Sequence, residues 1–363
     1  MPVAPSHPAT FSLPNTDPDS ATRSTDTDAS HARLSAARLG YLPDPFAPLF
    51  VTRPAGVSNR PGIINVGTWL RTRSVDELVE QFVARTAGEG EAQVQVQVQV
   101  LSVGAGSDTR FWRLATGPLK DKIARYVEVD FPEITASKAR SIYKHRELKD
   151  VLGECTLGGG GTSLHSAVYT LLPVDLRQPP STALAALTTP APAPPGSGAR
   201  APLLSRTLPT LVLAECVLPY MPPQAGEALL AWAAGAFGGA GVGVGVVLYE
   251  MFGLGDAFGG VMRENLAARG IRIPGTLPSL AALQSRFTSA GYARSSALTL
   301  QDIRTHYVPP SETERVAQLE LIDEWEELDL VLRHYCVAWA SRGLEGEGGL
   351  GWGLQKAGGA AGE

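Results

Sequence analysis

Residues 101–114, Leu-Ser-Val-Gly-Ala-Gly-Ser-Asp-Thr-Arg-Phe-Trp-Arg-Leu, decide the fold that we predict for this chain, together with residues 126–132, Tyr-Val-Glu-Val-Asp-Phe-Pro. The first stretch has the pattern of a strand, a glycine-rich turn and a helix, and the second that of another strand ending in an acid. Gly104 and Gly106 let the backbone pass close to a ligand where a Cβ would clash, and Asp130 can accept hydrogen bonds from both ribose hydroxyls. The segment predicts half of a nucleoside cofactor site, although a glycine pair also ends strands in other α/β proteins.

The type of cofactor follows from a missing glycine. Thr109 stands at the third position of the dinucleotide fingerprint G-x-G-x-x-G. That glycine packs a helix beneath a pyrophosphate, so its absence disfavours a dinucleotide. S-adenosylmethionine carries no phosphate and needs only the close backbone approach and the acid that binds the ribose. We therefore expect S-adenosylmethionine as the cofactor.

Further motifs follow in order along the chain: Asp28-Ala-Ser30, Leu39-Gly-Tyr-Leu-Pro-Asp-Pro-Phe46, Pro61-Gly-Ile-Ile-Asn65, Ala214-Glu-Cys-Val-Leu-Pro-Tyr-Met221, Tyr249-Glu250, Met262-Arg-Glu-Asn-Leu266 and Leu332-Arg-His-Tyr-Cys-Val-Ala-Trp-Ala340. Together with the first segment, this set resembles the leucine carboxyl methyltransferase family, which methylates the C-terminal leucine of type-2A protein phosphatases. The resemblance covers residues 28 to 342. It implies a seven-stranded, Rossmann-like methyltransferase sheet with an N-terminal helical segment.

Hydrophobic periodicity predicts the same α/β class, because helical and strand patterns alternate and alternation favours a doubly wound, mostly parallel sheet. We expect strands at about 94–103, 124–130, 166–174, 211–217, 242–250, 293–299 and 331–340. Helices are expected at about 74–86, 108–115, 132–143, 223–237, 256–269, 279–290 and 311–327. The last two strands could form the antiparallel hairpin that closes methyltransferase sheets.

Residues at the ends of the predicted strands should converge, because ligands of open α/β sheets bind outside the carboxyl ends of the strands. Gly104, Asp130, Asp175 and Glu215 all stand at such ends. We expect Asp175 to accept the exocyclic amine of the adenine and Leu176 to offer it an apolar edge. A role for Asp175 as a loop-capping acid is the alternative.

Charged residues of the site are expected at the methionine end of the cofactor. Glu215 follows an apolar run and would be costly to bury without a cationic or polar partner, which the ammonium and sulfonium groups of the cofactor supply. The resemblance implies that Arg71 clamps the cofactor's carboxylate and that Arg33 is a second basic contact to the cofactor. Without the resemblance, Arg71 and Arg73 would be typical of solvated charges at a helix start.

The reaction that the resemblance implies needs no general base. An α-carboxyl group has a pKa of about 3.3 to 3.7 and is ionised at pH 7. His306 and His334 are therefore expected to be structural. The candidate catalytic residues are Arg71 and Tyr220, whose phenol could orient one oxygen of the substrate carboxylate. Tyr249 either lines the peptide entrance or belongs to the core.

Composition restricts the partners. The net charge is −5 and no Lys/Arg cluster stands next to aromatic residues, which argues against nucleic acid. No apolar run approaches the ~20 residues that span a bilayer, and no secretory signal is recognisable. The three cysteines form no C-x-x-C motif, so neither a disulfide framework nor a metal site is expected. We expect a cytoplasmic protein, with a nuclear setting also compatible, and a monomer.

The expected domain organisation is a single methyltransferase domain over residues 27–342. Residues 1–26 are rich in Ser, Thr, Pro and Asp and are expected to form a disordered tail, and residues 343–363 a Gly-rich one. Residues 178–209, dominated by Pro, Ala and Thr, are expected to be an inserted surface loop. The Gln-Val repeat of residues 93–100 should lengthen the first strand, with its outer part buried or frayed.

Three functions remain open. The leading one is methylation of the carboxyl group of the C-terminal leucine of the type-2A phosphatase catalytic subunit. The second is methylation of a small-molecule carboxylate or hydroxyl, and the third is a catalytically inactive module that binds the phosphatase. The sequence departs from the family's pattern chiefly on the substrate side, at Val66, Thr68, Trp69, Pro219 and Met251.

Overall fold

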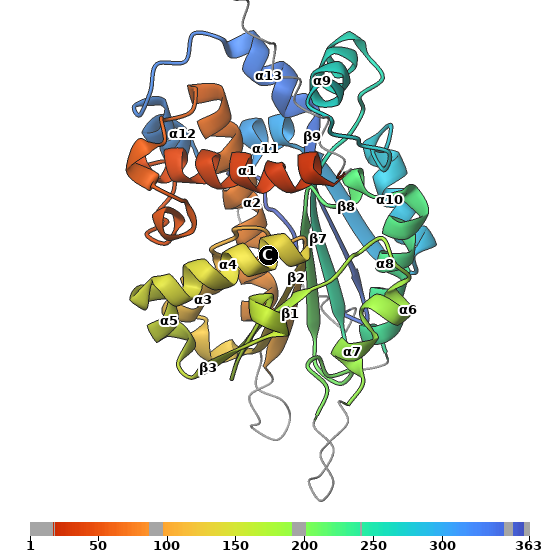
Figure 1. The fold of residues 1–363 in the computed structure, drawn as a ribbon. Helices are drawn as coiled ribbons and strands as arrows, with labels where there is room; N and C mark the ends of the chain where they lie inside the picture. The colour runs from red at the N-terminus through yellow and green to blue at the C-terminus, as the bar shows by residue number, and fades with distance from the viewer. Residues whose placement is uncertain are drawn as a thin grey trace, which may run out of the picture.

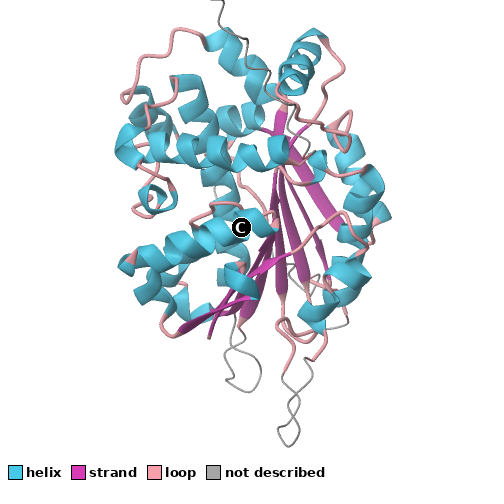
Figure 2. Ribbon diagram, in the orientation of Figure 1, coloured by secondary structure: helices cyan, strands magenta, loops and turns pink. Residues whose placement is uncertain are grey.

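A mixed sheet forms the centre of the molecule and helices cover both of its faces (Figure 1, Figure 2). The computed structural model describes residues 17, 19–86, 97–190, 201–239, 242–344 and 351–358. Within these residues the sheet has nine strands in the order β3-β4-β5-β2-β1-β6-β7-β9-β8. Their bounds are β1 Val98–Val103, β2 Ile123–Asp130, β3 Cys155–Gly158, β4 Ser163–Ser166, β5 Tyr169–Pro173, β6 Thr210–Glu215, β7 Val244–Met251, β8 Arg294–Thr299 and β9 Tyr335–Arg342.

The predicted doubly wound sheet is confirmed, with two strands more than the seven expected. Strands β5, β2, β1, β6 and β7 pair in parallel, and β9 pairs antiparallel with both β7 and β8 as the closing hairpin. The additional strands β3 and β4 form an antiparallel hairpin on the outer side of β5. They were missed because each has only four residues and lacks a clear alternation of apolar and polar side chains.

The helices divide between the two faces of the sheet. Figure 1 shows α3, α4 and α5 on one side and α6, α7, α8 and α10 on the other. Every residue of β1 is buried, because alternate residues enter two separate cores, Val98 and Val100 on one face and Leu101 and Val103 on the other. The helices are α1 Ser20–Arg38, α2 Gly62–Thr86, α3 Arg110–Thr116, α4 Pro132–Lys144, α5 Arg146–Leu152, α6 Pro180–Ala183, α7 Ala185–Thr188, α8 Pro223–Phe237, α9 Ala257–Ala268, α10 Leu280–Ser289, α11 Leu300–His306, α12 Pro310–Ala317 and α13 Trp325–Arg333.

Two helix predictions were wrong in extent. The helix expected over 74–86 begins at Gly62, and the one expected over 311–327 is divided into α12 and α13. In the first case tertiary contacts extend the helix, since Val66, Trp69 and Leu70 are buried and the Asn65 amide donates to Glu320 at 2.7 Å. In the second case the residues between α12 and α13 are not helical, and they bury Ile322 in the core while Leu321 is 93% exposed.

The N-terminal boundary at residue 26 was also wrong, because α1 begins at Ser20. Figure 1 shows this helix, in red, lying beyond the ends of the central strands. Its composition is too polar for the helix to be foreseen, and charged contacts to distant segments hold it. Asp19 accepts two hydrogen bonds from Arg177, at 2.7 and 2.9 Å.

Two other segments expected to lack structure pack against the core. In the predicted loop 178–209, α6 and α7 bury Leu184 and Leu187, and Leu204 is buried beside them. In the predicted tail 343–363, the Trp352 indole donates to the Leu78 carbonyl at 2.8 Å. Residues 191–200, 345–350 and 359–363 and the start of the Gln-Val repeat at 93–96 lie outside the described residues, as do residues 1–16.

Candidate functional site

A cavity of about 580 Å³ opens at the carboxyl ends of the central strands, with α1 forming one wall. All site residues predicted from the sequence line it: Arg33, Arg71, Gly104, Gly106, Asp130, Asp175, Leu176, Glu215 and Tyr220. His306 and His334 do not line it. The cavity therefore joins the cofactor residues and the candidate catalytic residues in one site.

The glycine turn after β1 has left-handed backbone at both glycines, with φ of +60° at Gly104 and +49° at Gly106. The space that a Cβ would need is taken by other parts of the protein. A Cβ at Gly104 would lie 2.4 Å from Val217 Cγ2, and one at Gly106 would lie 2.6 Å from Asp26 Oδ1. Both glycines are thus required by the fold of the turn as well as by the approach of a ligand.

We expect Gly104→Ala to weaken both folding and cofactor binding. A left-handed alanine and the collision with Val217 together cost on the order of 2 kcal/mol or more. Thermal unfolding and calorimetric titration with S-adenosylhomocysteine measure the two effects. Gly235→Ala is the matched control, because Gly235 lies within α8 and a Cβ there meets no atom within 4 Å. Equal melting temperatures for the two variants would contradict the expectation.

Asp130 holds the turn from the end of β2. Its Oδ2 accepts a hydrogen bond from the Gly106 amide at 2.7 Å, and its Oδ1 accepts one from the Phe131 amide at 2.7 Å. Burial raises the pKa of Asp130 to about 6, against these two amides, which lower it. Each oxygen keeps a second lone pair for a ligand hydroxyl.

Asp175 has partners within its own loop. Its carboxylate accepts hydrogen bonds from the Arg177 backbone amide at 3.0 Å and from Arg177 Nε at 2.8 Å, and these contacts lower its pKa. The loop-capping role considered as the alternative is therefore present. The same acid lines the cavity beside Leu176, where it can also accept a donor from an adenine.

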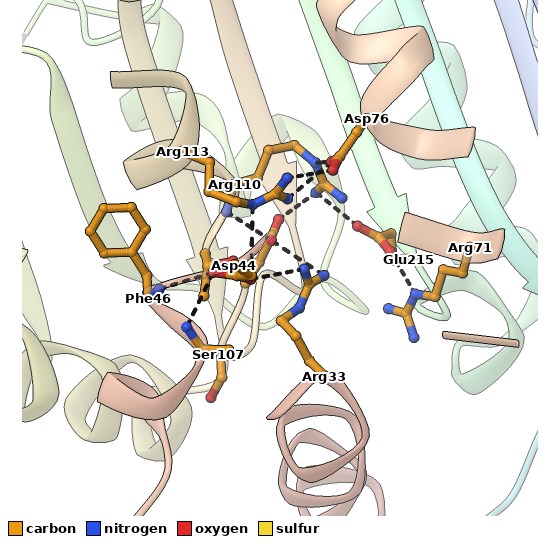
Figure 3. Close-up of polar contacts among 12 residues, drawn as sticks. Arg33, Asp44, Phe46, Arg71, Asp76, Ser107, Arg110, Arg113 and Glu215 are labelled. Carbon is orange, nitrogen blue, oxygen red and sulfur yellow. Dashed lines mark hydrogen bonds and ion pairs between the residues drawn. The ribbon is translucent and has the colours of Figure 1, made fainter. Parts of the chain in front are cut away.

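Glu215 is paired with two arginines of the protein itself (Figure 3). Arg71 Nε donates to Oε2 at 2.6 Å and Arg110 Nη1 donates to Oε1 at 2.8 Å. Although burial opposes ionisation, Arg110 and Arg71 hold the pKa of Glu215 below its ordinary value. The cofactor was the partner expected for this charge, and the structure adds two arginines of the protein, of which Arg110 had no recognisable signal in the sequence as a partner.

Arg110 is the centre of a larger buried network (Figure 3). Its side chain is 1% exposed and also donates to Asp76 at 2.7 Å and to Asp108 at 2.5 Å. Arg113 forms an ion pair with Asp76, and Arg33 Nη1 lies 3.3 Å from Asp44 Oδ2. The network comprises Arg33, Arg71, Arg110 and Arg113 with Asp44, Asp76, Asp108 and Glu215, so four positive charges balance four negative ones.

Sequence reasoning gave no role to Arg110, Arg113, Asp44 or Asp76. Arg110 and Arg113 stand in the segment 101–114 itself, and Asp44 stands in the motif 39–46, so the motifs contained the only signal. Nothing in the sequence singled out Asp76, because an acid on a helix is ordinarily solvated. Of the residues that depart from the family's pattern, Thr68 and Met251 line the cavity.

Arg71 presents donors to the cavity. Its guanidinium stacks over the Tyr249 ring, 4.6 Å from the centroid, while Nε is held by Glu215. Its two terminal nitrogens have no hydrogen-bond partner within the described residues. Tyr249 is 6% exposed and lines the cavity, so it belongs both to the core and to the site. Burial raises the pKa of Tyr220, which therefore remains a donor at neutral pH.

Comparison with known proteins places these motifs in one family. Residues 21–234 match the family model for leucine carboxyl methyltransferase. The chain is 42% identical to leucine carboxyl methyltransferase 1 of Cryptococcus neoformans, over 91% of this chain and 97% of that protein. It is 37% identical to the protein of the same name from Aspergillus fumigatus, over 91% of this chain and 84% of that one. The chain belongs to the leucine carboxyl methyltransferase family.

The chain is also similar to a longer protein. The chain is 35% identical to the rat tRNA wybutosine-synthesizing protein 4, over 88% of this chain and 44% of that protein.

No helix in the part of the chain described here is long and apolar enough to cross a membrane. In the same residues no three His, Cys, Asp or Glu side chains are grouped so that they could hold a metal ion.

The cavity of this leucine carboxyl methyltransferase family member fits S-adenosylmethionine, the methyl donor. Asp130 has free lone pairs and no cationic partner among the described residues, so it can hold the ribose. The terminal nitrogens of Arg71 can hold a carboxylate. Leu176 with Asp175 can take the adenine at the other side of the turn. These are the roles that the sequence analysis predicts for the same residues.

The raised pKa of Asp130 predicts a pH dependence of cofactor binding. Ionised Asp130 accepts a ligand hydroxyl more strongly than the protonated acid does, so affinity for S-adenosylhomocysteine should fall below pH 6, by up to about tenfold per pH unit, and binding near pH 6 should release a proton. The contribution to stability has the opposite sign. Because the unfolded pKa is about 3.9, this group's contribution to the free energy of unfolding decreases as pH rises from about 4 to 6.

Calorimetric titrations between pH 5 and 8, in buffers of different ionisation enthalpy, measure the affinity and the proton release together. Asp130→Asn is the control, and it should bind weakly with little pH dependence. Glu128, whose pKa burial raises to about 7, is present in both proteins and so cancels in the comparison. An affinity independent of pH in the unmodified protein would contradict the assignment of Asp130.

Proposed function

We propose that this enzyme methylates the α-carboxyl group of the C-terminal leucine of the type-2A protein phosphatase catalytic subunit, giving a leucine methyl ester. The curated relatives named leucine carboxyl methyltransferase 1 support the reaction. The phosphatase as substrate follows from the resemblance of the motifs. The enzyme is proposed to bind the C-terminal tail of the catalytic subunit.

The observation that carries the proposal is the position of Arg71. Its guanidinium is fixed on two sides, by Glu215 and by the Tyr249 ring, and its remaining donors face a cavity that also holds the cofactor residues. A fixed guanidinium with free terminal nitrogens is suited to a carboxylate, whether that of the cofactor or that of the peptide. The network around it is neutral, so a carboxylate brought by a ligand meets no unpaired acid there.

The protein's part in the reaction is to position the carboxylate. S-adenosylmethionine, when bound, supplies an electrophilic methyl group. The substrate carboxylate is ionised at pH 7, so none of the cavity residues has to remove a proton. Tyr220, at the end of the 3₁₀ turn Leu218–Tyr220 after β6, can donate to one oxygen of that carboxylate. Holding two reactants in the right geometry can contribute roughly 7 to 11 kcal/mol to lowering the barrier.

The main alternative is methylation of a small-molecule carboxylate or hydroxyl, and it uses the same cofactor residues. Thr68 and Met251, which depart from the family's pattern, line the cavity and are the residues that could alter the substrate. The inactive phosphatase-binding module is the other alternative. It predicts that the cofactor does not bind at all.

The deciding experiment is transfer of labelled methyl from S-adenosylmethionine to the purified type-2A catalytic subunit. A subunit lacking its terminal leucine serves as the matched substrate control, and treatment with mild base distinguishes an ester from an amide or ether. We expect base-labile label on the intact subunit alone. Label on neither subunit, with the cofactor still bound, would reject the phosphatase and favour a small carboxylate. Absence of cofactor binding would favour the inactive module.

A further inference from the structure

Asp26 lies on the wall of the cavity that α1 forms. Its Oδ1 accepts a hydrogen bond from the Ser107 backbone amide at 2.6 Å, and its Oδ2 accepts one from the Ser107 hydroxyl at 2.9 Å. The preceding amide, that of Gly106, donates to Asp130. Two consecutive amides of the glycine turn thus hold two carboxylates from different elements side by side.

These two carboxylates differ from the other acids of the cavity. Among the described residues, the other acids that line it are ion-paired with an arginine: Asp19 and Asp175 with Arg177, Asp28 with Arg60 and Arg269, Asp108 with Arg33 and Arg110, and Glu215 with Arg71 and Arg110. Asp26 and Asp130 have no ion pair within those residues, and the charge of Asp26 adds to the rise in the pKa of Asp130. A ligand that offers hydrogen-bond donors would stabilise these two unpaired carboxylates.

We propose that Asp26 is a second cofactor-binding carboxylate, which takes one hydroxyl of the ribose diol while Asp130 takes the other. The proposal rests on S-adenosylmethionine as the cofactor. A diol has two neutral O–H donors next to each other, so each can meet one of the two adjacent carboxylates. Each Asp26 oxygen uses one lone pair on Ser107 and keeps another for the ligand.

The geometry of Gly106 supports an essential position for Asp26. The carboxylate lies so close to the turn that a Cβ at Gly106 would be 2.6 Å from Oδ1. Asp26 is therefore seated at the same point of the turn at which Asp130 binds, and not merely on the outer surface of α1. Because Asp26 belongs to α1, a hydroxyl bound by it also joins this helix to the cofactor.

The test is a double-mutant cycle between Asp26 and the ligand hydroxyls. Calorimetric titration compares S-adenosylhomocysteine with its 2′-deoxy and 3′-deoxy analogues on the full chain and on Asp26→Ala and Asp26→Asn. We expect Asp26→Ala to weaken S-adenosylhomocysteine about 10- to 100-fold, as for a lost hydrogen bond to a charged group. The deoxy analogue that lacks the hydroxyl bound by Asp26 should bind weakly to the unmodified chain. Removing Asp26 should then weaken its binding little further.

Asp26→Asn keeps an acceptor for the Ser107 amide, so it preserves the turn if Asp26→Ala perturbs folding. Ser107→Ala removes only the hydroxyl contact and should retain most of the affinity. Asp150→Asn is the charge-matched control, because Asp150 is on α5, its side chain is 64% exposed and it does not line the cavity.

Two outcomes would overturn the proposal. Removing a ribose hydroxyl from the ligand weakens binding by some factor in each protein. If this factor is the same in the unmodified chain, in Asp26→Ala and in Asp26→Asn for both deoxy analogues, Asp26 acts only through Ser107. If Asp26→Ala binds S-adenosylhomocysteine as tightly as Asp150→Asn does, Asp26 does not take part in binding. Failure of the unmodified, folded chain to bind S-adenosylhomocysteine is a separate result, which rejects the cofactor and with it the proposed function.

Discussion

Replacing Arg110 with Met is expected to lower the free energy of unfolding by about 3 to 5 kcal/mol. The guanidinium is 1% exposed and contacts three carboxylates, those of Asp76, Asp108 and Glu215. A methionine fills a similar volume but supplies no charge, so the network is left with one negative charge in excess. Breaking a buried pair from one side is costly, because the remaining charge is neither solvated nor compensated.

The loss should depend on pH with a definite sign. Despite burial, which opposes ionisation, arginines including Arg110 lower the pKa values of Asp76, Asp108 and Glu215. The stability gained from a lowered pKa is present above the unfolded pKa of about 4 and is lost as pH falls through the folded one. The difference between Arg110→Met and the unmodified protein should therefore be largest near pH 7 and decrease below about pH 4.

Urea unfolding followed by circular dichroism at several pH values gives both quantities. Arg146→Met is the matched control, because Arg146 forms an i,i+4 pair with Asp150 and its side chain is 89% exposed. Such surface pairs contribute only a few tenths of a kcal/mol. If the free energy of unfolding of Arg110→Met is within 1 kcal/mol of that of the control at pH 7, the network does not hold the site together as described.

The second large effect is expected on catalysis. Arg71→Ala should reduce kcat/KM for the carboxylate substrate by at least about 100-fold, since a charge-assisted pair of hydrogen bonds to a carboxylate is lost and Glu215 loses one of its two partners. Arg71→Lys keeps the charge but cannot keep both the Glu215 contact and a forked contact to a ligand. It should recover only part of the loss.

Steady-state methyl transfer, with separate titrations of cofactor and substrate, measures this effect. Arg73→Ala is the control on the same helix, because Arg73 pairs with Glu77 at 3.3 Å and does not line the cavity. Its kcat/KM should stay within about twofold of the unmodified enzyme. An Arg71→Ala variant as active as Arg73→Ala would show that the carboxylate is held elsewhere.

Several features of the site could be predicted from the sequence because they are local. The turn at Gly104 and Gly106 and the acid Asp130 at the end of the next strand stand within one strand-turn-helix-strand unit. Hydrophobic periodicity places the strands, and parallel strands bring their carboxyl ends to one edge. For Arg33 and Arg71 the motifs of the family were needed, since isolated arginines on helices carry no signal of their own.

The sequence by itself determined the α/β class, the central strands, the cofactor turn and the membership of this family. Only the tertiary structure decided that α1 begins at Ser20 and brings Asp26 to the turn, that β3 and β4 extend the sheet, and that Arg110 joins Asp76 to Glu215. The physical reason is the range of the interactions. Apolar periodicity and glycine geometry act over a few neighbouring residues, whereas a buried charge is stable only where distant segments bring a partner to it.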